Sequence, residues 1–291
     1  MSKDSNGRFK LALAQIKPTL GNVSANLKIH EDFFDRAVGA GADLVVFPEL
    51  SLAGYYLQDL VPDVSIDPAD SDVFDKMRDL SHRADLVVGF VERGADFRFF
   101  NSAAYLSKGE VVHIHRKLYL PTYGMFDEYR YFSPGDTLRA LETRFGTVGI
   151  LICEDMWHPS TFFLLANDGA QLILGPSAGP GRGVYRGQTL GSVYAWQHII
   201  HSASQSYMIY VTHCNRVGVE DGVSFGGGSE ISDPFGTCVA SAATLDEDLI
   251  FADIDKSEIQ RARTLYPLMR DERLDLDMRE LERIYKKRFG L

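Results

Sequence analysis

The sequence predicts a mixed α/β fold in which two stacked sheets carry helices on their outer faces. Apolar runs of strand length alternate with helical patterns along most of the chain. Several neighbouring runs are spaced as hairpins, which adds antiparallel pairs to the parallel ones. The runs number about a dozen, more than one open sheet usually carries before it divides in two.

The expected elements follow in order along the chain. The strands that we expect span residues 9–16, 44–47, 86–90, 100–107, 111–115, 147–152, 171–174, 208–214, 225–231, 238–243 and 249–254. The helices that we expect span residues 22–39, 71–83, 161–168 and 190–206. Phe33, Phe34 and Ala37 supply the apolar face of the first helix, and Lys108-Gly109 provides the turn of a hairpin.

Composition and charge exclude several functional classes. The 291 residues are 45% hydrophobic and 24% charged, which is ordinary for a globular protein, and the net charge is -10. That charge disfavours nucleic acid and anionic membranes as partners. No signal-peptide core or membrane-spanning run is visible, so we expect a cytoplasmic protein. Three widely spaced cysteines form neither a disulfide framework nor a metal-binding pattern.

Cys153 is the first candidate for chemistry. It follows the aliphatic run 148–152 and precedes Glu154 and Asp155, as a thiol at the carboxyl end of a buried parallel strand would. Ligands of open α/β sheets bind at such strand ends. Taken alone, an unpaired cysteine is more often an inert core residue. Cys214 and Cys238 lack this context, and we expect both to be structural.

Three further charged residues stand where strands end. Glu49 follows the run 44–47 and could serve as general base for a thiol, while Lys117 follows the strand near 111–115 and could stabilise an oxyanion. Glu128 could orient Lys117 and a hydrolytic water. Each residue could equally be a solvated surface charge, the commoner fate of glutamate and lysine.

In combination, these motifs resemble those of the nitrilase superfamily of carbon–nitrogen hydrolases along nearly the whole chain. The residues that carry the resemblance are Phe47-Pro48-Glu49-Leu50, Arg116-Lys117-Leu118-Tyr119-Leu120-Pro121, Ile152-Cys153-Glu154-Asp155, Cys214-Asn215-Arg216-Val217-Gly218 and Gly227-Gly228-Ser229. The resemblance implies a Glu49–Lys117–Cys153 triad supported by Glu128. It also implies an oxyanion held by Lys117 and the backbone N–H of Glu154.

The same resemblance implies a four-layer α-β-β-α sandwich, which we expect to form a single domain over residues 1–291. It implies hydrolysis without a cofactor or metal. It also implies a homodimer or higher homo-oligomer in which helices of two subunits pack together. We expect the charged C-terminal segment, from about residue 260 to 291, to pack at a subunit interface.

Within the superfamily, some motifs look closest to the glutaminase domain of glutamine-dependent NAD synthetases. These are Pro48-Glu49-Leu50-Ser51-Leu52-Ala53-Gly54-Tyr55, Leu120-Pro121-Thr122-Tyr123-Gly124-Met125-Phe126-Asp127-Glu128 and Cys153-Glu154-Asp155-Met156-Trp157. No Ser-Gly-Gly-x-Asp-Ser pyrophosphatase loop is present, so we expect a stand-alone enzyme. The Gly- and Pro-rich segment 175–183 is expected to shape the substrate entrance.

The substrate pocket is the least defined part of the site. The aromatic residues that could wall it, or equally belong to the core, are Tyr55, Tyr123, Phe126, Trp157 and Tyr185. Arg182 or Arg186 could bind a substrate carboxylate, although an arginine beside glycines is often only a solvated loop residue.

We therefore expect an amidase that converts a small-molecule amide to acid and ammonia through a cysteine thioester. One alternative is a nitrilase acting on small nitriles, but nitrilases usually have Cys-Trp-Glu at the nucleophile where this chain has Cys153-Glu154-Asp155. The other alternative is a glutaminase-like subunit that supplies ammonia to a separate synthetase.

Overall fold

The first large sheet follows from the most apolar runs of the N-terminal half. The computed structural model describes residues 7–185 and 189–290. The first sheet has the order β17-β1-β2-β3-β4-β5. Its strands are β1 (Arg8–Gln15), β2 (Leu44–Val46), β3 (Asp85–Arg93), β4 (Phe99–Ser107), β5 (Glu110–Arg116) and β17 (Asp248–Asp255). β2 pairs in parallel with β1 and β3, and the outer pairs are antiparallel.

The second large sheet has the order β16-β15-β12-β8-β7-β6, with β9 paired to β12 beside that path. Its strands are β6 (Leu141–Thr143), β7 (Gly146–Ile150), β8 (Leu172–Leu174), β9 (Pro176–Ser177), β12 (Tyr210–Asn215), β15 (Glu230–Ser232) and β16 (Cys238–Ser241). β8 pairs in parallel with both β7 and β12. Two smaller hairpins are formed by β10 (Val184–Tyr185) with β11 (Thr189–Leu190) and by β13 (Val217–Glu220) with β14 (Val223–Gly226).

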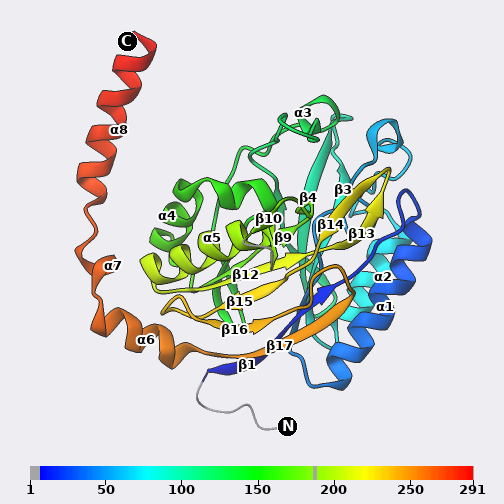
Figure 1. Ribbon diagram of the computed structural model, residues 1–291, viewed down its shortest axis with the longest axis horizontal. Coiled ribbons are helices and arrows are strands. Elements are labelled where there is room, and N and C mark those ends of the chain that lie inside the picture. The colour runs from blue at the N-terminus through cyan, green and yellow to red at the C-terminus, as the bar shows by residue number, and fades with distance from the viewer. Residues whose placement is uncertain (1–6, 186–188, 291) are drawn as a thin grey trace.

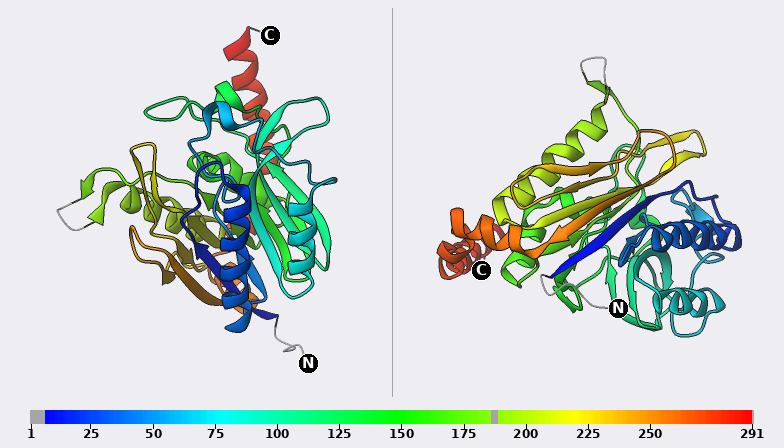
Figure 2. Two further views of the ribbon diagram at one scale, coloured as in Figure 1. Left: turned by 90° about the vertical axis from the view of Figure 1, so that its right-hand side faces the viewer. Right: turned by 90° about the horizontal axis from the view of Figure 1, so that it is seen from below.

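Helices cover the outer face of each sheet, which completes the four layers (Figures 1 and 2). α1 (Val23–Gly39) and α2 (Asp72–Ser81) pack on the first sheet through one apolar cluster. α4 (Pro159–Asn167) and α5 (Gly191–Tyr207) cover the second sheet, and a larger cluster fills the space between the sheets. The expected α-β-β-α sandwich is thus confirmed.

Short segments at one end of the sheets connect these layers. They include the 3-10 helices η1 (Gln58–Leu60) and η2 (Cys153–Trp157) and the single helical turn α3 (Glu128–Tyr131). η2 and α3 begin at two of the residues that the sequence singles out.

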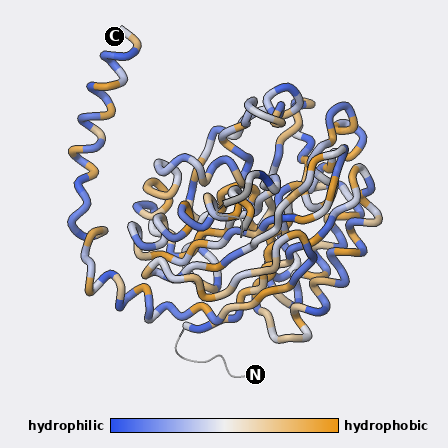
Figure 3. The backbone as a smooth tube through the Cα atoms, viewed as in Figure 1, coloured by the Kyte–Doolittle hydropathy of each residue, from blue (hydrophilic) through white to orange (hydrophobic). Residues whose placement is uncertain are grey.

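The C-terminal segment leaves the sandwich in three helices, α6 (Lys256–Leu265), α7 (Leu268–Asp271) and α8 (Leu274–Phe289). α8 projects away from the rest of the protein and has no buried residue (Figure 1). Hydrophobic and hydrophilic residues alternate along it (Figure 3). Its exposed large apolar residues are Leu274, Leu276, Met278, Leu281, Ile284, Tyr285 and Phe289.

Several sequence-based expectations are wrong in detail. The single strand expected over 225–231 is interrupted, because Gly227 and Gly228 have φ angles of 63° and 70° that end β14 and start a turn before β15. The strand expected over 147–152 ends at Ile150. The hairpin of β13 and β14 was not expected. Cys214 is buried as expected of a structural thiol, but Cys238 is exposed and is not a core residue.

In the described part of the chain, no helix combines the length and the hydropathy required to span a bilayer.

Candidate active site

Three side chains from different strands meet between the two sheets. Glu49 comes from the turn after β2, Lys117 directly follows β5, and Cys153 begins η2 after β7. Glu49 and Lys117 are each 1% exposed, and Cys153 is 6% exposed. A buried lysine and a buried glutamate require partners, because burial without one would strongly favour their neutral forms.

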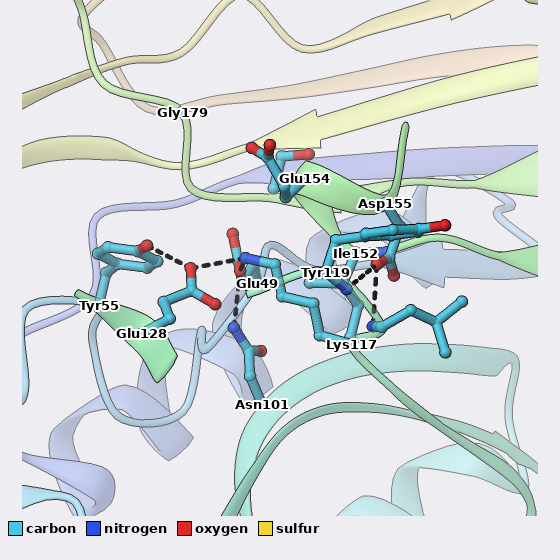
Figure 4. Close-up of polar contacts among 12 residues, drawn as sticks. Glu49, Tyr55, Asn101, Lys117, Tyr119, Glu128, Ile152, Glu154, Asp155 and Gly179 are labelled. Carbon is cyan, nitrogen blue, oxygen red and sulfur yellow. Dashed lines mark hydrogen bonds and ion pairs between the residues drawn. The ribbon is translucent and has the colours of Figure 1, made fainter. Parts of the chain in front are cut away.

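The ammonium of Lys117 is the centre of this cluster (Figure 4). Its Nζ donates to Oε1 of Glu49 and to Oε1 of Glu128, each at 2.6 Å. Glu49 Oε1 also accepts from Asn101 Nδ2 at 2.7 Å, and the hydroxyl of Tyr55 donates to Glu128 Oε1. One cation is therefore shared by two carboxylates, and each carboxylate has a second donor that fixes its orientation.

Each of the two carboxylates has one buried oxygen that accepts no hydrogen bond from the described residues. Glu49 Oε2 and Glu128 Oε2 have no hydrogen-bond partner among the residues that the structure describes. Unpaired buried acceptors are uncommon in native proteins and usually mark a place for water, a ligand or a transferred proton. The cluster can thus accept protons at two positions beside the thiol.

Asp155 ties the turn of Lys117 to the turn of Cys153. Its Oδ1 accepts from the backbone N–H groups of Leu118 at 2.9 Å and Tyr119 at 3.1 Å (Figure 4). Its Oδ2 accepts from Ile152 N at 3.0 Å and lies 2.9 Å from His115 Nε2. One buried carboxylate therefore fixes the relative position of the amine and the thiol.

Cys153 itself has a φ angle of 43°, which is unfavourable for a residue with a side chain. Strain of this kind concentrates at functional sites, where the surrounding structure maintains it. Here the bonds of Asp155 to both turns provide that support.

Three aromatic side chains pack on one another beside Glu128 and Glu154. Tyr55 and Glu128 also line a cavity of about 340 Å³, whose lining residues do not include Phe126 or Tyr123. The ring of Phe126 meets the rings of Tyr55 and Tyr123 edge-on, at centroid distances of 6.2 and 5.4 Å. The hydroxyl of Tyr123 donates to Glu154 Oε2 at 2.8 Å. Tyr55, Tyr123 and Phe126 thus lie together, and their role as a pocket wall stays a prediction.

Arg182 lies beside the loop that carries Tyr123 and Gly124. A methyl group added at Gly124 would come within 3.2 Å of Arg182 Nη1, so the guanidinium lies against the segment that carries Tyr123. Glu154, Tyr123 and Arg182, called the rim below, thus bring together one carboxylate, one phenol and one guanidinium.

Comparison with known proteins gives this geometry its context. The family described as carbon-nitrogen hydrolase matches residues 10–264, which is most of the chain. The chain belongs to this family. The resemblance expected from the motifs is thereby confirmed, and the protein is a carbon–nitrogen hydrolase.

Individual relatives of this hydrolase differ in length. A glutamine-dependent NAD(+) synthetase from Thermotoga maritima is 34% identical over 267 residues, which cover 90% of this chain and 45% of the relative. A citrullinase from Francisella tularensis is 27% identical over 285 residues, covering 92% of this chain and 96% of the relative. The chain thus spans about half the length of the synthetases that it matches.

A solved structure supports the fold. The carbon-nitrogen hydrolase of Helicobacter pylori G27 superposes with a TM-score of 0.83 at 23% identity, covering 93% of this chain and 97% of that one. At this identity the likeness concerns the fold alone.

The charge state of the hydrolase site follows from burial and from the paired carboxylates. Burial opposes the charge of Lys117, but Glu128 and Glu49 outweigh that effect and hold its pKa well above the ordinary value. Burial also raises the pKa of Cys153 well above normal, with the charge of Glu49 acting in the same direction. The resting site therefore holds an ammonium and a neutral thiol, so attack requires a base.

The acids of the hydrolase site differ from one another. Burial raises the pKa of Glu128 to about 7, against the opposing effect of Lys117. Burial also raises the pKa of Glu154, where the bond from Tyr123 opposes the shift. Glu128 thus gains or loses a proton more readily near neutral pH than an exposed glutamate does.

Some residues predicted for the pocket lie elsewhere or outside the described part of the hydrolase. Trp157 is 45% exposed, meets Trp196 edge-on at 5.4 Å and lines a groove between α4 and α5, because η2 rotates it away from the position of Cys153. The structure does not group it with the other aromatic residues. The side chain of Tyr185 and the whole of Arg186 lie outside the described residues.

Asn101 and Asp155 are parts of the site to which the sequence had assigned no role. Asn101 is fully buried within the mostly apolar strand β4, and a polar amide in such a run is the signal that could have found it. Asp155 follows the nucleophile motif directly but is visible as a link between turns only in the folded chain.

Proposed function

We propose that this hydrolase cleaves the terminal amide of a small amino acid to an acid and ammonia, with Cys153 as nucleophile. The observation that carries the proposal is the ammonium of Lys117, held between Glu49 and Glu128 in a buried cluster beside a protonated thiol. A thiol, a base and a fixed positive charge are the parts that acyl transfer from an amide requires.

In the first step, Glu49 accepts the thiol proton as the sulfur attacks the amide carbon. The negative charge that develops on the amide oxygen is stabilised by Lys117 and by the backbone N–H of Glu154. The C–N bond then breaks, and the leaving nitrogen takes the proton from Glu49 and departs as ammonia. Cys153 remains acylated as a thioester.

In the second step, a water molecule replaces ammonia. Glu49 removes a proton from the water, with Glu128 holding Lys117 and orienting the water, and the hydroxide attacks the thioester carbon. The C–S bond breaks, and the thiolate recovers the proton from Glu49. Cys153, Glu49 and water supply every proton and electron pair, so the proposal involves no cofactor.

The rim of the pocket favours an amino-acid substrate. Glu154 could pair with an α-ammonium group, and Arg182 could bind an α-carboxylate through two hydrogen bonds. Tyr123 fixes the direction of the Glu154 carboxylate through their 2.8 Å bond. The names of the relatives, which include glutamine-dependent synthetases and a citrullinase, support the same substrate class.

A panel of substrates tests this function. Ammonia release would be measured from glutamine, citrulline, simple aliphatic amides, N-carbamoyl compounds and nitriles, with Cys153→Ala as the control. We expect turnover of amino-acid amides and a thioester adduct on Cys153 in quenched samples. Turnover of nitriles alone, or ammonia release that persists in Cys153→Ala, would exclude the proposal.

A second candidate is an ammonia-supplying subunit for a separate synthetase. The 34% identical match to a synthetase, which covers 45% of that relative, supports this role. It differs from the first in one measurable respect, because glutamine hydrolysis should then accelerate when a synthetase partner and its acceptor substrate are added.

We also propose that two copies associate through their C-terminal segments and the α4–α5 face. The groove between α4 and α5 is lined mainly by apolar residues, and α8 exposes apolar residues beyond the same end of the fold. α7 contacts α5, so α8 begins beside that face. Light scattering on Leu281→Glu/Ile284→Glu should then show a smaller particle than the unchanged protein.

A cytoplasmic location of this protein likewise stays a prediction.

A further inference from the structure

A buried ion pair lies behind the pocket wall and has no role in the steps above. Arg216 Nη1 pairs with Glu220 Oε1, and the two side chains are only 1% and 3% exposed. Removing two charges from water is costly, and an apolar pair often stabilises a fold equally well. A buried pair at this place therefore suggests a specific task.

The carboxylate oxygen of Glu220 that does not pair with Arg216 indicates what that task is. Glu220 Oε2 accepts from the backbone N–H groups of Tyr55 at 2.9 Å and Tyr56 at 3.0 Å. Gly54, just before them, has a φ of 85°, and a Cβ there would lie 2.8 Å from Glu220 Oε1. The carboxylate thus sits against the backbone that leads into Tyr55.

The hairpin that carries Glu220 also contacts Tyr55 and the segment 176–183. The Phe225 ring on β14 lies 4.2 Å beneath the Arg216 guanidinium and meets the ring of Tyr55 at 5.8 Å. The same strand bonds the 176–183 segment, through Gly181 N to Ser224 O at 2.8 Å and Gly226 N to Gly179 O at 3.2 Å. The hairpin therefore connects Tyr55 with the segment 176–183.

We propose that Glu220 is a positioning residue for hydrolysis, which acts through Tyr55 to hold Glu128 against Lys117, and that Arg216 holds the Glu220 carboxylate in place for this purpose. The path consists of three hydrogen bonds: Glu220 to the Tyr55 backbone, the Tyr55 hydroxyl to Glu128, and Glu128 to Lys117 Nζ at 2.6 Å. This inference rests on the proposed function in one respect, the supporting role of Glu128.

Loss of the carboxylate should release the Tyr55 segment and weaken the bond of its hydroxyl to Glu128. Misplacement of a catalytic group by about 1 Å can reduce a rate about 100-fold. Glu220→Gln keeps the shape of the side chain but removes its charge. We expect it to lower kcat/KM about 10-fold or more, with most of the change in kcat.

Tyr55→Phe, alone and combined with Glu220→Gln, identifies the route. If Glu220 acts through the Tyr55 hydroxyl, the effects of the two substitutions on kcat/KM should be strongly non-additive. The double variant should then be nearly as active as the less active of the two single variants. The matched control is Asp85→Asn. Asp85 is equally buried and ion-paired, with Arg144 at 3.0 Å, but begins β3 at the opposite end of the strands from the site. It should lower Tm while kcat/KM changes less than about threefold.

A second measurement does not depend on the substrate. The rate of Cys153 alkylation by iodoacetamide, followed against pH by mass spectrometry, reports the charges around the thiol. Its profile should shift alike in Glu220→Gln and Tyr55→Phe and stay unchanged in Asp85→Asn. If the proposed function fails, the unchanged protein releases no ammonia, yet this profile still tests Glu220.

The outcomes are distinct. Wild-type activity and an unchanged alkylation profile in folded Glu220→Gln would overturn the inference, as would additive effects with Tyr55→Phe. Glu220→Gln leaves the Arg216 guanidinium buried without its partner. If that variant does not fold, the paired replacement Arg216→Met/Glu220→Gln removes this unpaired charge as well. A folded paired variant with full activity would overturn the inference in the same way.

Discussion

The buried triad and the pocket rim are both built around carboxylates, but they differ in solvent exposure. Glu49 and Glu128 are buried and share one ammonium, whereas Glu154 is half-buried and bonds to Tyr123, which is 56% exposed. A buried network is rigid because every unmet bond is costly. A solvated rim can exchange its partners with water at little cost. In the proposed function, this contrast separates chemistry, which requires fixed groups, from substrate choice, which requires accessible ones.

The strongest test of the buried side is loss of the nucleophile. Cys153→Ala should reduce amide hydrolysis by about 10⁴-fold or more, because no other group in the proposed mechanism can form the thioester. Ammonia release measures it, and Cys214→Ala, at another buried thiol, should stay within about threefold of the unchanged protein. Similar losses in both variants would indicate damage to the fold rather than a role for Cys153.

Removal of the shared cation should have the next largest effect. Lys117→Met leaves two buried carboxylates without their common partner, so kcat should fall about 10²- to 10³-fold and the free energy of unfolding by about 3–5 kcal/mol. Single-turnover kinetics and chemical denaturation measure the two effects. The control is Lys28→Met, which replaces an exposed lysine. Retained activity would assign oxyanion stabilisation to other groups.

The rim should respond in KM rather than in kcat. Glu154→Gln should raise KM for an amino-acid amide about 10-fold, through loss of a charge-assisted hydrogen bond, and leave kcat within about threefold. An aliphatic amide of the same length but without an α-ammonium should show no such change. An equal rise in KM for both substrates would contradict the proposed ammonium contact.

The smallest expected effect is a pH dependence of stability. The pKa of Glu128 is about 7 in the fold and 4.5 as the ordinary value, so between these the folded protein binds more protons than the unfolded chain. Its contribution to the free energy of unfolding therefore decreases as pH rises from about 4.5 to 7. Denaturation of the unchanged protein and Glu128→Gln at several pH values should show this decrease only in the former. Parallel curves would assign no raised pKa to Glu128.

Local patterns predicted much of the fold and the chemistry of the site. The strand before Glu49, the strand before Lys117 and the helices over 22–39 and 190–206 lie within a few residues of the expected bounds. The expected strand over 225–231 failed, because the paired glycines determine a turn that hydrophobicity alone does not reveal. The sequence likewise did not reveal that Trp157 lies against Trp196 rather than with Tyr55, Tyr123 and Phe126, since the direction of a side chain in a 3-10 turn depends on the turn.

The sequence by itself determined the layered α/β class, the three chemical groups of the triad and the family, since these depend on residue types and their spacing. Only the tertiary structure decided that Lys117 contacts two carboxylates, that Asp155 joins two turns and that Glu220 reaches the backbone of Tyr55. These contacts connect residues far apart in the chain. Their geometry depends on how the two sheets stack, which no local pattern encodes.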